Sequence, residues 1–267
     1  MAKKVAEQLV DTLIEAGVRR IYAVTGDSLN EVNEAVRQNE AMKWIHVRHE
    51  ETGAYAAGAE AQLTGLPGCC AGSSGPGHVH LINGLYDAHR SGAPVIAIAS
   101  TIPTGEFGTE YFQETNTVKL FNDCSFYNEV ATTPEQFPRM LQSALQTATT
   151  RKGVAVVGLP GDLAKKPAVK VESSEQIYPL ASSVCPAEED LIRLAGMLNH
   201  YERITLFCGI GCKGAHEEII RMSETLNAPV AYTFKGKMEV QYDNPYEVGR
   251  TGLLAITACM KRKYLSC

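Results

Sequence analysis

A charged cluster at residues 48–51, Arg-His-Glu-Glu, separates an apolar run at residues 44–47 from an alanine-rich helical pattern. A carboxylate at the start of a helix is stabilised by the helix dipole and needs no function. However, the predicted strand before it would end here, and open α/β sheets bind ligands at the carboxyl ends of their strands. Glu50 is therefore a candidate for acid–base chemistry, with the helix-start carboxylate as the structural alternative.

A glycine-rich segment, Gly-Ser-Ser-Gly-Pro-Gly at residues 72–77, follows the next predicted strand. Glycine allows a backbone to approach a flat ligand closely and to adopt unusual dihedral angles. The same composition also suits a tight strand-to-helix turn. We consider both readings equally supported by this segment alone.

A second glycine motif, G-x-G-x-x-G at residues 209–214, lies between a predicted strand and a predicted helix, as in dinucleotide-binding turns. The following strand leads into Lys235, where an NAD site would have an acid for the ribose. This pattern favours a nucleotide-type site other than a standard NAD site, and a plain tight turn remains the alternative. Cys208 and Cys212 have no second pair nearby, so we predict no metal site.

Predicted apolar strands and helices alternate along residues 1–165. These elements must position the candidate residues of the first domain. Continuous apolar strands indicate a parallel sheet that is covered on both faces. We therefore predict an α/β fold with a doubly wound parallel-sheet domain at residues 1–165 and a linker at 166–186. An incomplete Rossmann-like domain follows at residues 187–267, with two strands and two helices and then an atypical basic tail.

The bulk composition narrows the function. The formal net charge of the 267 residues is -5, which argues against a nucleic-acid surface. The N-terminus is not typical of a secretory signal, and no apolar run approaches the roughly 20 residues of a membrane span. We expect a cytoplasmic chain with reduced cysteines.

Several segments together resemble the N-terminal pyrimidine-binding domain of thiamine-diphosphate enzymes. They are TGDSLNEV, VRHEETGAYAAGAEAQLTG, GSSGPGHVHLINGLYDAHRSGAPVIAIA and EYFQETN. Within that superfamily they are most similar to pyruvate oxidases, in particular the flavin- and quinone-dependent pyruvate dehydrogenase. The resemblance covers residues 3 to about 254.

The resemblance implies that Glu50 hydrogen-bonds N1′ of the aminopyrimidine. This contact favours the imino tautomer, whose 4′-nitrogen removes the thiazolium C2 proton before attack on pyruvate. Phe112 and Gln113 match residues that line the substrate side. The corresponding pocket wall would contain Gly26, Ser74, Gly75, Pro76 and Gly77.

The second domain resembles the FAD-binding central domain of the same family. Nine residues would lie along the flavin cofactor: Gly209, Gly211, Lys213, Thr233, Lys235, Thr251, Gly252, Leu253 and Leu254. The implied reaction is oxidative decarboxylation of pyruvate to acetate or acetyl phosphate, with electrons passing to FAD and then to a quinone or oxygen. The family forms homo-oligomers, either dimers or tetramers.

The resemblance stops after Leu254, and no G-D-G motif occurs in the sequence. In the family this motif holds Mg²⁺ and the diphosphate in a C-terminal domain. We therefore expect a truncated pyruvate oxidase, arising from a frameshift near residue 255 and inactive alone. The alternatives are an acetolactate synthase-like carboligase and a non-catalytic remnant that dimerises or binds nucleotide.

Overall fold

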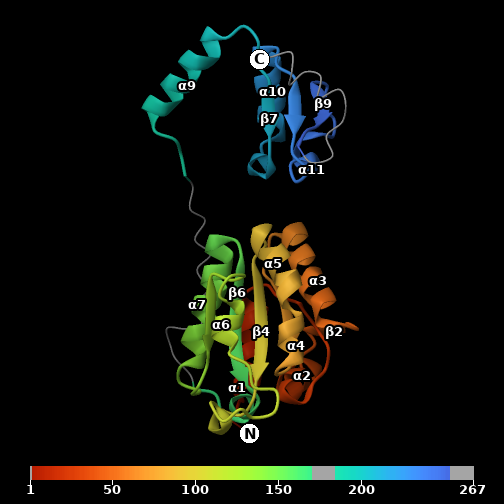
Figure 1. The fold of residues 1–267 in the computed structure, drawn as a ribbon, viewed down its shortest axis with the longest axis vertical. Helices are drawn as coiled ribbons and strands as arrows, with labels where there is room; N and C mark the ends of the chain where they lie inside the picture. The colour runs from red at the N-terminus through yellow and green to blue at the C-terminus, as the bar shows by residue number, and fades with distance from the viewer. Residues whose placement is uncertain (1, 170–183, 253–267) are drawn as a thin grey trace. The chain divides into compact units, whose positions relative to one another are not determined.

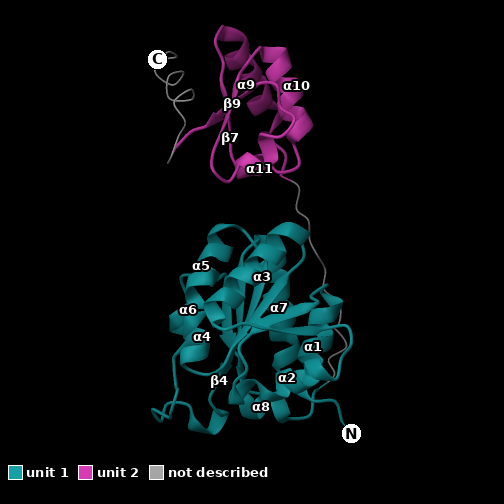
Figure 2. Cartoon of the chain, turned by 90° about the vertical axis from the view of Figure 1, so that its right-hand side faces the viewer, with its two compact units in different colours: residues 1–182 teal, residues 183–267 magenta. Residues whose placement is uncertain are grey.

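The computed structural model describes residues 2–169 and 184–252. The chain divides into two compact units, residues 1–182 and 183–267, and each is described by itself (Figures 1 and 2). The predicted linker at residues 166–186 lies largely outside the described residues. The predicted boundaries at residues 165 and 187 stay predictions.

The first unit is built on a six-stranded parallel sheet with the order β2-β1-β3-β4-β6-β5. The predicted α/β class with a parallel sheet is confirmed. The chain first adds β2 on one side of β1 and then returns to add β3 on the other side. The strands are β1 (Arg20–Ala23), β2 (Lys43–His46), β3 (Gly68–Gly72), β4 (Val95–Thr101), β5 (Tyr127–Val130) and β6 (Val154–Pro160).

Helices connect these strands and cover both faces of the sheet. Their ends follow the expected chemistry: α3, for example, stops where Gly65 adopts φ of 73°, a left-handed conformation that glycine tolerates. The helices are α1 (Val5–Glu15), α2 (Asn30–Arg37), α3 (Glu50–Thr64), α4 (Pro76–His80), α5 (Ile82–Arg90), α6 (Thr117–Phe121), α7 (Phe137–Arg151) and α8 (Gly161–Lys165), with short 3₁₀ turns η1 (Asp27–Leu29) and η2 (Thr104–Glu106).

Alternate residues of the central strands face opposite sides, which divides the core into two layers. Ile96 and Ile98 of β4 pack with α1, α2 and α7, whereas Val95 and Ala97 pack with α3 and α5. Both sets are fully buried. A strand that is buried on both faces does not show the alternation of apolar and polar residues that a half-exposed strand has. A continuous apolar run is therefore the pattern expected for it.

The second unit contains a three-stranded parallel sheet with the order β7-β8-β9. The sequence analysis predicted only two strands and two helices here, and this was wrong because β9 and α11 are also present. Both additional elements are four residues long and carry polar side chains, so neither has a clear apolar period. The elements are α9 (Glu188–His200), β7 (Leu206–Cys208), η3 (Ile210–Cys212), α10 (His216–Leu226), β8 (Val230–Tyr232), α11 (Lys237–Val240) and β9 (Glu247–Arg250).

Prolines stand near two helix starts in the first unit. α4 begins at Pro76, and α5 follows after Leu81. α7 begins at Phe137 with Pro138 in its first turn, although Pro134 precedes it. Proline is equally acceptable at both positions, and the side chain of Gln136 accepts from the backbone N–H of Thr132, which holds the intervening residues in a turn.

Among the described residues, no helix combines the length and the apolar character that a membrane crossing requires.

Candidate active site

The candidate site lies where the strand order reverses, between β1 and β3. The carboxyl ends of these strands lead into Gly26 and into the turn at residues 73–77, and α3 begins just after β2. The two loops approach very closely: a Cβ placed on Gly26 would lie 2.4 Å from the Cβ of Ser73. The switch point of a doubly wound sheet is where such folds form a ligand crevice.

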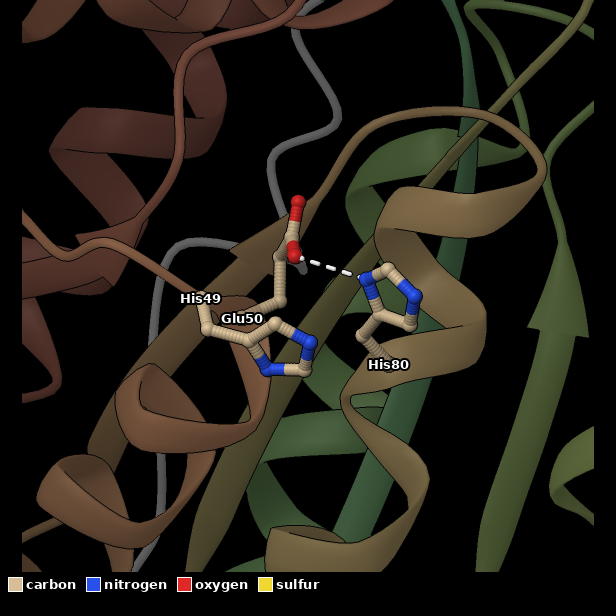
Figure 3. A group of neighbouring side chains, drawn as sticks. All are labelled: His49, Glu50 and His80. Carbon is tan, nitrogen blue, oxygen red and sulfur yellow. Dashed lines mark hydrogen bonds and ion pairs between the residues drawn. The ribbon is translucent and has the colours of Figure 1, made fainter.

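Glu50 is the first residue of α3 and is 8% exposed. Its Oε2 atom lies 3.0 Å from Nδ1 of His80, the last residue of α4 (Figure 3). A Cβ on Gly77 would lie 3.3 Å from Oε1, so the glycine turn reaches the carboxylate. Within the described part of the chain, no protein group hydrogen-bonds Oε1. One oxygen is thus held by His80, and the other can accept a hydrogen bond from a ligand.

His49 and His80 both lie near this carboxylate. Their rings stack with centroids 4.4 Å apart, and His49 caps α3 by accepting from the backbone N–H of Glu51 at 3.3 Å. Nothing in the sequence indicated a role for His80. Its contact with Glu50 was missed because the two residues are thirty positions apart and belong to different helices.

The loop before α6 brings one of the two predicted substrate residues to the glycine turn. Ser74 Oγ lies 3.1 Å from Gln113 Oε1 and donates to it, and a Cβ on Gly75 would lie 2.7 Å from the Cβ of Gln113. Gln113 itself has φ of 66°. Phe112, by contrast, is 79% exposed and contributes little to the wall of this unit.

His78 is a buried structural residue beneath the loop. Its side chain, on the short helix α4, is fully buried. Its Nδ1 lies 2.8 Å from the carbonyl oxygen of Ser100 and must donate to it, so Nε2 accepts from the hydroxyl of Thr115. Burial lowers the pKa of His78, which favours the neutral ring, the form in which Nε2 is the acceptor.

A cavity of about 560 Å³ opens beneath the same loop, at the carboxyl ends of β4 and β5. Its wall includes Thr101, Gln113 and Val130. Gln113 thus contacts the glycine turn beside Glu50 and also lines this cavity. The cavity is large enough for a small organic substrate.

In the second unit, three predicted site residues follow the carboxyl ends of its three strands. Gly209 follows β7, Thr233 follows β8 and Thr251 follows β9. Hydrogen bonds continue the strand pairing at this end: the N–H of Thr233 donates to Cys208 O of β7 at 2.9 Å, and that of Thr251 donates to Tyr232 O of β8 at 3.0 Å. The three residues therefore share one edge of the parallel sheet.

The other residues predicted to bind the flavin in this unit do not all directly follow a strand. Gly211 lies within η3, so the glycine motif forms a 3₁₀ turn before α10 begins at His216. Lys213 and Lys235 follow β7 and β8 at the same edge, and Gly252 has φ of 97°. Leu253 and Leu254 lie outside the described residues.

Cys208 precedes the glycine turn and Cys212 lies within it. Burial, with the neighbouring Cys212, raises the pKa of Cys208 to about 12, so its thiol stays protonated at neutral pH.

Comparison with known proteins identifies both units. Residues 3–120 match the family described as thiamine pyrophosphate enzyme, N-terminal TPP binding domain. Residues 191–262 match the central domain of the same enzymes. The two matches fall on separate units and occur in the order that this family description implies.

Three curated relatives align along nearly the whole chain. A Pseudomonas amyloderamosa protein, described as an uncharacterized 42.6 kDa protein in an isoamylase 3′ region, is 49% identical over 96% of this chain and 65% of its own length. A pyruvate oxidase of Lactiplantibacillus plantarum is 35% identical over 90% of this chain and 40% of its own. A chloroplastic acetolactate synthase of Arabidopsis thaliana is 29% identical over 94% of this chain and 38% of its own. The chain therefore spans less than two thirds of each relative.

Proposed function

Because the chain belongs to the thiamine pyrophosphate enzyme family, we propose that Glu50 activates thiamine diphosphate for the oxidative decarboxylation of pyruvate. The observation that carries the proposal is the position of Glu50: a mostly buried carboxylate at the switch point, with one oxygen held by His80 and the other without a partner among the described residues. These features suit a protonated nitrogen of an aminopyrimidine ring, so the residues present fit the cofactor.

The protein groups have distinct tasks in this proposal. Glu50 holds a proton at its Oε1 edge and shares it with the ring nitrogen of the cofactor. His80 fixes the carboxylate by donating from Nδ1 to Oε2, which leaves Oε1 as the acceptor. The thiazolium ring, when bound, supplies the electron sink for loss of carbon dioxide from a 2-keto acid.

The turn at residues 73–77 and the loop that carries Gln113 form the neighbouring wall. Ser74 orients the Gln113 amide by donating to its oxygen, so the amide N–H groups of Gln113 remain for a carbonyl or carboxylate of pyruvate. Phe112 is exposed and would cover the substrate only when a further surface meets this loop. We further propose that the chain assembles into a homo-oligomer. Pyruvate is the substrate in this proposal.

The second unit is assigned to FAD in the same proposal. The carboxyl-end edge of its sheet, where a nucleotide can bind, is lined by Gly209, Thr233 and Thr251. Positive charge for the phosphates is supplied at that edge by Lys213 and Lys235. A quinone or oxygen would be the final electron acceptor. Mg²⁺ and the diphosphate are assigned no residues here, because the sequence contains no G-D-G motif.

The test is turnover of pyruvate by this chain with the C-terminal remainder of the Lactiplantibacillus plantarum pyruvate oxidase supplied as a separate polypeptide. We expect release of carbon dioxide that requires thiamine diphosphate, together with reduction of an artificial electron acceptor. Formation of acetolactate without acceptor reduction would instead assign the acetolactate synthase reaction. Failure to bind thiamine diphosphate in any combination would refute the proposal.

A further inference from the structure

The side chains of His49, Glu50 and His80 form a group with the donor set of a transition-metal site. One potential ligand atom from each residue lies within 4.8 Å of the other two. Figure 3 shows that the group comes from two elements, with His49 and Glu50 at the start of α3 and His80 at the end of α4. Two imidazoles and one carboxylate are a common ligand set for a zinc ion that keeps an open position.

We propose that His49, Glu50 and His80 bind one Zn²⁺ ion. Ligand atoms around a tetrahedral zinc ion lie about 3.4 Å apart, since each zinc–ligand bond is about 2.0–2.2 Å. The pair His80 Nδ1 and Glu50 Oε2 is already at 3.0 Å. The ion takes the place of the proton that these two atoms share, and small side-chain rotations bring in the third ligand.

The exposure of the three side chains suits an ion that enters from solvent. The side chains of His49 and His80 are 48% and 44% exposed, whereas that of Glu50 is 10% exposed. Two half-exposed imidazoles can thus capture the ion, and the buried carboxylate neutralises part of its charge. A water molecule would complete the coordination.

Glu51 provides an outer contact that metal-binding histidines usually have. Its Oε2 lies 3.8 Å from His49 Nδ1, and Asn83 Nδ2 donates to its Oε1 at 2.6 Å. When His49 binds the ion through Nε2, its Nδ1–H can donate to this carboxylate. Such a contact orients the ring and makes it a better ligand. In the structure without the ion, His49 Nδ1 instead accepts a hydrogen bond from the Glu51 N–H. That bond is long, at 3.3 Å, and would be given up.

The zinc site uses the same carboxylate that the proposed function assigns to the cofactor. Bound zinc would therefore withdraw Glu50 from the aminopyrimidine, and this consequence rests on the proposed function. The site itself does not, because zinc binding can be measured without thiamine diphosphate. The absence of a metal site was predicted from the spacing of Cys208 and Cys212, and nothing in the sequence brought these three residues together.

The experiment is calorimetric titration of the full chain with Zn²⁺ in the absence of cofactor, under reducing conditions. His49→Ala and His80→Ala should each weaken binding at this site by at least about tenfold, and the double variant should bind one ion fewer per chain. The control is His46→Ala, an exposed histidine on β2 outside the group, which should leave binding unchanged. Zinc held by cysteine thiols is common to the native chain and its four variants and cancels in the comparison.

Circular dichroism checks that each variant is folded, and two independent single variants guard against misfolding of one. Co²⁺ serves as a second probe, since its visible absorption reports the coordination by imidazole and carboxylate. Equal zinc stoichiometry and affinity in the native chain and the folded double variant would overturn the proposal. Absence of pyruvate turnover alone would count against the proposed function and leave this result unaffected.

Discussion

The amide oxygen of Gln113 accepts a hydrogen bond from Ser74 Oγ at 3.1 Å, across thirty-nine positions of the chain. This contact joins the loop before α6 to the glycine turn after β3. Gln113 also has φ of 66°, which a residue with a side chain adopts only when its surroundings hold it. The loop is therefore anchored at this residue, while its neighbour Phe112 is exposed.

Gln113→Ala should lower the free energy of unfolding by about 1 kcal/mol, because the hydrogen bond to Ser74 is lost. Phe112→Ala is the matched control and should change it by less than about 0.5 kcal/mol, since the ring is largely exposed. Urea unfolding of the two variants and the native chain measures the difference. Equal destabilisation by both variants would show that the contact with Ser74 does not anchor the loop.

Glu50→Gln should reduce pyruvate decarboxylation by at least about 100-fold, because an amide cannot hold and return the proton that the cofactor requires. Glu51→Gln removes a carboxylate one position away and should retain most of the activity. The measurement is release of carbon dioxide in the reconstituted assay described above. Activity of the Glu50 variant close to the native value would remove this residue from the mechanism.

The stability of the first unit should decrease as the pH falls through the range in which His78 titrates. Burial lowers the pKa of His78 in the folded chain, so the unfolded chain binds a proton at a higher pH than the folded chain does. This stabilisation is complete above the ordinary histidine pKa of about 6.5 and is lost as the pH falls from there to the lowered value.

His78→Gln should therefore show a smaller fall in the urea midpoint between about pH 7 and pH 5 than the native chain. The variant is less stable at every pH, so the comparison uses the change with pH within each protein. His89, whose pKa burial also lowers, is present in both proteins and cancels. Parallel pH profiles for the two proteins would contradict the assignment.

Gly84→Ala should destabilise the first unit by about 1–3 kcal/mol, because α3 and α5 approach too closely to accept a methyl group. A Cβ at Gly84 would lie 2.6 Å from the Cβ of Ala54 and 2.8 Å from the backbone nitrogen of Tyr55. The control is Gly105→Ala, where no atom lies within 4 Å of the new Cβ. Thermal and urea unfolding compare the two, and an equally small effect would mean that the helices can move apart.

Lys235→Glu should weaken FAD binding at least about tenfold if the second unit holds the flavin nucleotide, since a charge-assisted contact to phosphate becomes repulsive. Lys43→Glu makes the same charge change on β2 of the first unit and should leave the affinity unchanged. Quenching of flavin fluorescence provides the measurement. The flavin assignment fails if neither the native chain nor the variant binds FAD.

The sheet of the first unit could be predicted because its strands are unusually uniform. Val154–Pro160 is apolar throughout, Val95–Thr101 is apolar from Val95 to Ala99, and both strands are buried along their whole length, as a central parallel strand requires. β9, Glu247–Arg250, could not be found in this way, because a short polar segment becomes a strand only when β8 offers its edge.

The sequence predicted where the residues of the candidate site lie in the fold, but it did not predict which side chains contact one another. Glu50 and the glycine turn each follow a strand, so the order of the elements placed them at one edge of the sheet. Nothing in the spacing links Glu50 to His80, or Ser74 to Gln113, because these pairs depend on how helices and loops pack. His78 shows the same limit: its burial follows from a carbonyl on β4 and a hydroxyl on the loop.

The all-parallel arrangement of the first sheet determines when the candidate site forms during folding. Parallel neighbours cannot be joined by a hairpin, so each pairing closes a long loop; β4 and β6, for example, pair Val95 with Val154. Folding with such distant contacts is slow and cooperative. Glu50 follows β2 and His80 lies on the helix after β3, and both of these strands pair with β1, so we expect the contact between the two residues to form with the paired strands. The fraction of chains that bind a tight ligand at this site would therefore equal the fraction of fully folded molecules in a preparation.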